Sequence, residues 1–252
     1  MMIQYLIVCP LIFLAGLVDS IAGGGGLISL PAYLIAGVPP HVALGTNKTS
    51  SAMGTAVSTF RLAKHGYLKG KAVLALIASV SALCGSALGA RLALMVPDSV
   101  TRNLMIVVLP VTAWYVLRNK NIEGNGQEEK PEGGKLKVIV AASAFFIGGY
   151  DGFYGPGTGT FMLLILTGAA GLETRSASAL TKVTNLSSNL AALATFIVTG
   201  NVYYPLGLTA GLCSIAGNYL GAGLVVHDGQ KIVRPVVLLV LSILFIKILS
   251  GH

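Results

Sequence analysis

The stretch Leu44-Gly45-Thr46-Asn47-Lys48-Thr49-Ser50-Ser51 places an ammonium group among hydroxyl and amide side chains, within an otherwise apolar segment of membrane length. A lysine at membrane depth costs about 2.5–3.5 kcal/mol on insertion scales, so it normally faces a polar cavity or a partner. A second copy of this pattern, Ser178-Ala179-Leu180-Thr181-Lys182-Val183-Thr184-Asn185, places its lysine 134 positions after the first. The two stretches predict a polar site inside a membrane protein.

The composition is typical of a protein embedded in lipid. Of the 252 residues, 54% are hydrophobic and only 10% are charged, whereas soluble domains contain about 25% charged residues. Several near-continuous apolar stretches have the roughly 20 residues that a transmembrane helix needs. The net charge of +8 comes from basic residues that flank these stretches, so it indicates membrane topology rather than nucleic-acid binding. The lipid bilayer is the expected partner, and nucleic acid is not.

The apolar pattern predicts an all-α polytopic membrane protein with about 8–10 membrane segments. We expect two repeats, at 1–118 and 137–252, joined by a cytoplasmic linker at 119–136. The expected segments are 3–22, 27–37, 42–62, 72–95, 100–118, 137–150, 158–170, 176–199, 203–226 and 233–250. Segments 27–37 and 158–170 are short, so each is either a short crossing or one arm of a re-entrant hairpin.

The two halves resemble each other at a nearly constant offset. Asp19 and Asp151 lie 132 positions apart, and so do the glycines of a shared block. In that block, Gly-Ser-Ala-Leu-Gly-Ala-Arg-Leu at 85–92 and Gly-Asn-Tyr-Leu-Gly-Ala-Gly-Leu at 217–224 agree at five of eight positions. Internal repeats of this kind are common in secondary transporters.

Charge patterning predicts that the two repeats have inverted topology. Basic residues, among them Lys69 and Lys71, surround the loop after segment 42–62 and also fill the linker, so both should be cytoplasmic. The corresponding loop of the second half, 199–204, carries no basic residue and should lie outside. Equivalent loops would then lie on opposite sides of the membrane.

Each half begins with an apolar segment that ends in glycine. The first ends in Asp19-Ser20-Ile21-Ala22-Gly23-Gly24-Gly25-Gly26, and the second in Asp151-Gly152-Phe153-Tyr154-Gly155-Pro156-Gly157-Thr158-Gly159-Thr160. Consecutive glycines do not hold a regular helix and proline lacks an N–H group, so we expect the helix to break at both places. In lipid, such a break is tolerated only where it is buried in protein or lines a wet cavity. The helix that restarts offers free N–H groups and a positive dipole end to an anion.

These features together predict a central site for a small anion. The lysines supply charge, and hydroxyl, amide and backbone groups supply hydrogen-bond donors. The expected binding residues are Asn47, Lys48, Thr49, Thr181, Lys182, Asn185, Gly24, Gly25 and Gly157. In the alternative interpretation, the lysines extend toward lipid headgroups and the hydroxyls join helices. Asp19 and Asp151 admit three roles: helix caps, partners of the lysines, or proton carriers that couple transport to a gradient.

No pattern in the sequence indicates metal binding or catalysis. The three cysteines lie in apolar surroundings without Cys-x-x-Cys spacing, and the four histidines are not spaced as metal ligands. No nucleophile lies in a recognisable arrangement with a base. We therefore expect no metal, no cofactor and no enzymatic activity.

Four features resemble the TauE/SafE sulfite exporter family: the glycine run at 19–26 followed by Leu30-Pro31, the motif Gly45-Thr46-Asn47-Lys48, the helix with Gly85-xxx-Gly89, and the two-half layout. The resemblance implies transport of small sulfur-containing anions, such as sulfite, sulfonates, sulfoacetate or thiosulfate, across a bacterial inner membrane. The second half departs from the pattern, since Leu180-Thr181-Lys182 replaces the motif and Gly-Pro-Gly-Thr-Gly replaces the glycine run.

We therefore expect a secondary anion transporter with inverted repeats, a midplane site and alternating access. A carboxylate transporter and a passive anion channel are the nearest alternatives. An intramembrane enzyme or an assembly factor is an alternative from a different class. A homodimer is compatible with all of these interpretations.

Overall fold

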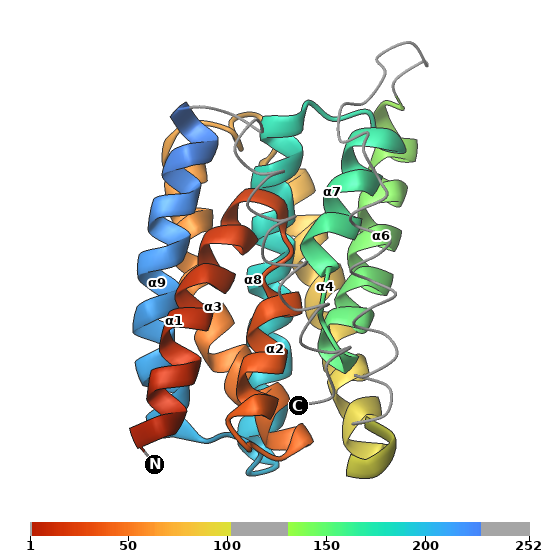
Figure 1. Cartoon of the computed structure of the whole chain (residues 1–252). Helices are drawn as coiled ribbons and strands as arrows, with labels where there is room; N and C mark the ends of the chain where they lie inside the picture. Colours follow the sequence, from red (N-terminus) through yellow and green to blue (C-terminus); the bar gives the residue numbers. More distant parts are fainter. Residues whose placement is uncertain (1, 102–130, 228–252) are drawn as a thin grey trace.

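The computed structural model describes residues 2–101 and 131–227, and within these residues it is helical without strands (Figure 1). The helices are α1 (Met2–Ala22), α2 (Gly26–Ile35), α3 (Pro40–Lys64), α4 (Ala72–Met95), α6 (Gly133–Phe153), α7 (Thr158–Gly168), α8 (Thr174–Val198) and α9 (Tyr204–His227). The all-α prediction is confirmed. Most of the expected segment 100–118, all of 233–250 and most of the linker lie outside the described residues.

The helix boundaries differ from the sequence predictions mainly at polar ends. Helix α6 begins at Gly133, so the last residues of the expected linker 119–136 are helical. Helix α3 likewise extends to Lys64, two residues beyond the expected end at 62. Each extension includes a lysine, Lys64 or Lys135, so a hydropathy pattern ends before the helix does.

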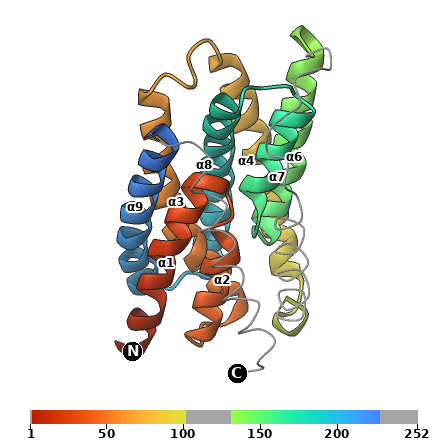
Figure 2. The same ribbon diagram turned by 45° about the horizontal axis from the view of Figure 1, so that its top comes forward.

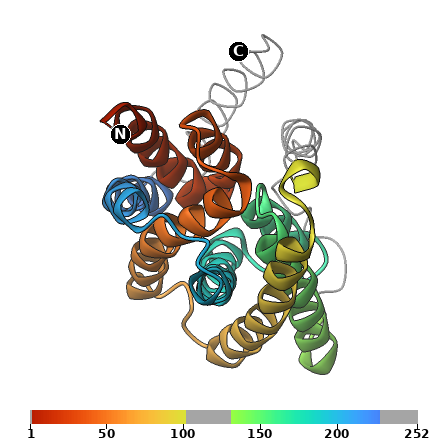
Figure 3. The ribbon, with the colours of Figure 1, turned by 90° about the horizontal axis from the view of Figure 1, so that it is seen from below.

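Four helices, α1, α4, α6 and α9, are long and apolar enough to cross a membrane. Helices α3 and α8 are equally long, at 25 residues each, but they carry many buried hydroxyl and amide side chains. They lie in the middle of the bundle, with α1 and α9 on one side and α4 and α6 on the other (Figure 3). Helix α8 lies between α3 and α4 (Figure 2). The polar side chains of α3 and α8 thus face the interior of the bundle, as polar side chains at membrane depth require.

The two short helices form hairpins with the helices before them. Helix α1 gives way to α2 at Gly23, whose φ is +74°, and α6 gives way to α7 through Gly155 and Gly157, whose φ values are +99° and +83°. These positive φ values confirm that the backbone breaks at both glycine stretches. Helices α2 and α7 have 10 and 11 residues, which gives each a length of about 15–17 Å, half of a hydrocarbon core of about 30 Å.

In Figure 1, α2 returns toward the end of the bundle where α1 begins, and α7 returns toward the opposite end, where α6 begins. This arrangement favours re-entrant hairpins over short crossings. The tips of the two hairpins meet inside the bundle. A Cβ atom added at Gly26 would lie 3.0 Å from the Cα atom of Pro156, and one added at Gly23 would lie 2.6 Å from the backbone nitrogen of Thr160. Glycine is therefore required where the two chain reversals touch.

The repeated glycine block has a packing role in both halves. On α4, a Cβ at Gly85 would lie 2.9 Å from the carbonyl carbon of Phe145 on α6. On α9, a Cβ at Gly217 would lie 2.9 Å from the backbone nitrogen of Leu17 on α1. Small residues allow such backbone contact between helices in lipid. The same block therefore joins α4 to α6 and α9 to α1.

Basic residues cluster at one end of the bundle. The loop between α3 and α4, with Lys69 and Lys71, lies at the same end as the start of α6, with Lys135 and Lys137, whereas the loop at 199–203 lies at the opposite end (Figure 1). The helix directions are opposite in the two halves, since α3 and α8 run in opposite senses. The inverted repeat, which would include residues outside the described ranges, and the assignment of the basic end to the cytoplasm stay predictions.

Candidate functional site

The two lysines occupy matching positions inside the bundle. Lys48 is the ninth residue of α3 and Lys182 is the ninth residue of α8, counted from Pro40 and Thr174. Each lysine is only 2% exposed. Neither ammonium group therefore reaches the lipid headgroups, and each must find its partners within the protein.

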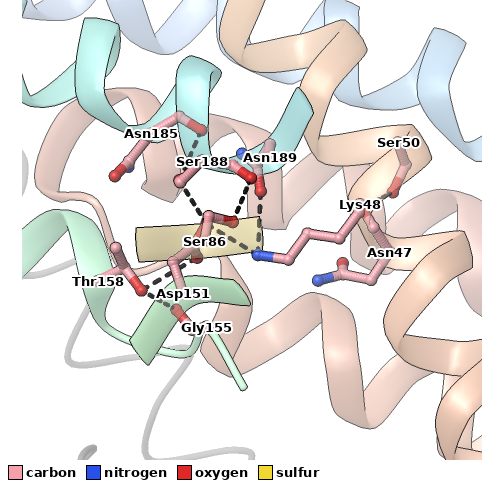
Figure 4. A network of polar contacts seen from close by, with 10 residues as sticks. All are labelled: Asn47, Lys48, Ser50, Ser86, Asp151, Gly155, Thr158, Asn185, Ser188 and Asn189. Carbon is pink, nitrogen blue, oxygen red and sulfur yellow. Dashed lines mark hydrogen bonds and ion pairs between the residues drawn. The ribbon is translucent and has the colours of Figure 1, made fainter. Parts of the chain in front are cut away.

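Lys48 forms an ion pair with a carboxylate from the other half of the chain (Figure 4). Its Nζ lies 2.8 Å from Oδ2 of Asp151, at the end of α6, and donates a hydrogen bond of 3.1 Å to Oδ1 of Asn189 on α8. Asp151 accepts two further hydrogen bonds, from Ser188 Oγ at 2.5 Å and from Thr158 Oγ1 at 3.1 Å. Three donors from three helices thus compensate this buried carboxylate.

Lys182 forms the corresponding pair with Asp19, near the end of α1. Its Nζ lies 2.9 Å from Oδ2 of Asp19 and also donates to the backbone carbonyl of the same residue. The side chain of Asp19 is 19% exposed, compared with 7% for Asp151. Within the described residues, Lys182 is the only group that donates to the Asp19 carboxylate. Of the three roles that the sequence leaves open for the aspartates, the structure shows the pairing with lysine.

A cavity lies between the two pairs, where the hairpin tips meet α3, α8 and α9. It leaves about 40 Å³ for the centres of water-sized molecules. Because one water needs about 10–15 Å³ on this measure, the space suits a few waters or one small oxyanion. Of the residues that the sequence singled out, those on the cavity wall are Asp19, Gly25, Asn47, Lys48, Asp151 and Asn185.

Five expected binding residues do not line the cavity: Gly24, Thr49, Gly157, Thr181 and Lys182. The hydroxyl of Thr49 donates to the carbonyl of Gly45 on its own helix, at 3.2 Å. Lys182 does not line the cavity, but its Nζ contacts the carboxylate of Asp19, which does. Gly157 adopts a left-handed backbone conformation, with φ of +83°, at the chain reversal before α7. Neighbouring residues of a helix point in different directions, so a continuous motif cannot direct every side chain into one site.

The sequence analysis missed several polar groups at the site. Asn189 and Ser188 follow Asn185 by four and three residues on α8, so the helical period places all three on one face. Ser214 and Asn218, four residues apart on α9, also line the cavity. The spacing of these residues could have identified them from the sequence. Polar side chains that recur every three or four residues in an apolar chain lie on one face of a helix.

Two cavity amides have unused hydrogen-bonding capacity. Asn47 and Asn185 are each 5% exposed, and the Oδ1 atom of each is buried without a hydrogen-bond partner. The oxygen and nitrogen of a side-chain amide are assigned from its hydrogen bonds, so each amide could present donors or an acceptor to a solute. The backbone N–H groups of Gly25 and Gly26, at the start of α2, also find no acceptor among the described residues.

The chain resembles probable membrane transporter proteins over most of its length. Residues 8–248 match the family described as Sulfite exporter TauE/SafE. A probable membrane transporter protein of a Sinorhizobium species is 36% identical over 238 residues, which cover 94% of this chain and 89% of that protein. A probable membrane transporter protein of Haemophilus influenzae is 35% identical over 230 residues, with coverages of 90% and 87%.

A third relative, a probable membrane transporter protein of Escherichia coli K12, is 31% identical over 236 residues, with coverages of 94% and 86%. No solved structure matches the chain. The family and the names of the relatives indicate a membrane transporter and not an enzyme, and the four long apolar helices agree with a multi-pass membrane protein. This chain belongs to the TauE/SafE sulfite exporter family of membrane transporters.

Proposed function

We propose that this protein is a secondary transporter of small sulfur-containing anions, of the sulfite, sulfonate, sulfoacetate or thiosulfate type, in a bacterial inner membrane. The cavity where the two broken hairpins meet carries the proposal. It combines the ammonium group of Lys48, the amides of Asn47 and Asn185 and the N–H groups of Gly25 and Gly26, which have no backbone acceptor among the described residues. An oxyanion needs several convergent donors of this kind, close to positive charge and to a helix N-terminus.

The same geometry supports alternating access. The substrate site of many secondary transporters lies near the bilayer midplane between two repeats, at discontinuous helices. Here the two hairpins enter from opposite ends of the bundle and their tips form the cavity wall. Movement of one hairpin against α3 and α8 would open the cavity toward one side, and movement of the other hairpin would open it toward the opposite side.

The first test is binding of sulfite, thiosulfate, sulfoacetate, taurine, sulfate and acetate to the purified protein. We expect saturable binding of a sulfur oxyanion that Lys48→Ala and Asn185→Ala weaken at least about tenfold, equal to about 1.4 kcal/mol. Lys64→Ala is the matched control, because Lys64 is an exposed lysine on the same helix. Wild-type affinity in folded Lys48→Ala and Asn185→Ala would place the site elsewhere.

Flux into liposomes separates the remaining alternatives. A transporter gives saturable uptake, whereas a channel would show conduction without saturation. Preference for acetate over every sulfur anion would indicate a carboxylate transporter. An enzyme or an assembly factor would give no flux above that of empty liposomes.

A further inference from the structure

The two ion pairs beside the cavity differ in how firmly they hold their carboxylates. Asp151 accepts from Lys48, Ser188 and Thr158. Among the described residues, Asp19 has only Lys182 as a donor, and its side chain is 19% exposed, compared with 7% for Asp151. Its second carboxylate oxygen, Oδ1, has no partner among the described residues. Both carboxylates lie on the cavity wall, but a solute displaces Asp19 more easily because Asp19 has fewer donors and is more exposed.

The charges around the cavity already balance. Lys48 comes from α3, Asp151 from α6, Lys182 from α8 and Asp19 from α1, so two positive charges face two negative charges. The remaining helices at the cavity, α2, α7 and α9, face it only with the uncharged residues Gly26, Ser29, Thr158, Gly159, Ser214 and Asn218. A monovalent anion that entered alone would leave one negative charge uncompensated in a buried site, which is strongly unfavourable.

We propose that Asp19 is a proton site that couples anion binding to proton uptake. The entering anion takes the place of the Asp19 carboxylate on the ammonium group of Lys182, and the carboxylate takes up one proton from water in the cavity. The charge is then balanced as before, because the anion replaces the negative charge that the proton removes. This inference rests on the proposed function and adds to it one co-transported proton for each monovalent anion.

Asp151 has a different role in this scheme. Its three donors come from α3, α7 and α8, and they remain in place while Lys182 exchanges partners. The Asp151 carboxylate thus keeps its ammonium partner and holds Lys48 and the tip of the second hairpin in position. The two aspartates occupy corresponding places in the two halves, but only Asp19 exchanges its partner.

The test measures methanesulfonate binding to purified protein by calorimetry between about pH 5 and pH 8, where the charge of this anion does not change. If one proton enters with each anion, the Kd rises about tenfold for each pH unit wherever the carboxylate is ionised in the free protein and protonated in the complex. A pH-indicator dye in weak buffer should report about one proton taken up per anion. This second measurement uses the wild-type protein and needs no variant.

Asp19→Asn should bind methanesulfonate with a Kd that is independent of pH and should take up no proton. Asp98→Asn is the matched control, because Asp98 is a 53% exposed carboxylate that does not line the cavity, and it should keep the wild-type slope. A flat Kd in wild type, or a wild-type slope in Asp19→Asn, would overturn the inference and leave the proposed function standing. Absence of saturable binding of any sulfur anion at every pH would overturn the proposed function itself, and this inference with it.

Discussion

Replacing Lys48 with methionine should destabilise the protein strongly, because the change keeps the length of the side chain but leaves the Asp151 carboxylate without its cation. The two side chains are 2% and 7% exposed, so bulk water cannot replace the missing charge. Removing one member of a buried ion pair typically costs about 3–5 kcal/mol. Ser188 and Thr158 still donate to Asp151, so we expect the lower end of this range, about 3 kcal/mol.

The double variant Lys48→Met/Asp151→Asn tests whether this cost comes from the pair. Asparagine has nearly the same shape as aspartate. Its amide oxygen can accept from one of the two hydroxyls, Ser188 or Thr158, and its NH2 group can donate to the oxygen of the other. With both charges removed, no buried charge is left unpaired, and the double variant should be about 2 kcal/mol more stable than the sum of the two single effects predicts. The pair of Lys182 with Asp19 should show a smaller effect, since the side chain of Asp19 is 19% exposed and that of Asp151 only 7%.

The free energy of unfolding can be measured by reversible denaturation with SDS in mixed micelles, and circular dichroism reports the loss of helix. The reasoning would be refuted by a cost below about 1 kcal/mol for Lys48→Met, or by single effects that add within about 0.5 kcal/mol. Either result would mean that Lys48 and Asp151 do not compensate each other in the folded protein.

Two other features can be tested directly. A Cβ at Gly89 would overlap the carbonyl oxygen of Gly149, so Gly89→Ala should lower the free energy of unfolding by about 1–3 kcal/mol or more in the same denaturation assay. Gly168→Ala is the control and should be neutral, because Gly168 has open space around it. Equal effects of the two substitutions would contradict the close packing of α4 on α6. In a variant whose native cysteines are replaced, Lys69→Cys should react with an impermeant thiol reagent only from the cytoplasmic side, and Asn201→Cys only from the outside. Labelling of both cysteines from the same side would contradict the placement of these two loops at opposite ends of the bundle in Figure 1.

The sequence predicts the helices and their breaks well because these features depend on local chemistry. Helix α4 spans 72–95 as expected, and both glycine stretches break the chain because glycine adopts positive φ at Gly23 and Gly155. Backbone propensity and hydropathy act over a few residues, so a single sequence contains the relevant information. The same holds for the burial of Lys48, which follows from its place in a long apolar segment.

The partners of the charged residues could not be predicted in this way. Lys48 pairs with Asp151 and not with Asp19, which is closer in sequence, because the hairpin of the second half reaches across the bundle to α3. This choice depends on the docking of segments about 100 residues apart, which no local pattern encodes. Thr181 belongs to the motif around Lys182 and yet does not reach the cavity, because helix rotation decides which motif residues face it.

The crossed pairing also limits how the protein can move. Each ion pair joins a central helix of one half to a hairpin of the other half, so a hairpin cannot move away from the central helices unless its pair breaks. The contacts of Asp151 connect α6 to α3, α7 and α8 at once, whereas those of Asp19 connect α1 to α8 alone. Separating either pair leaves two buried charges, unless an anion replaces the carboxylate on the lysine and a proton neutralises the carboxylate. The hairpin of α1 and α2 should therefore be the first to move, and only when both ions are bound.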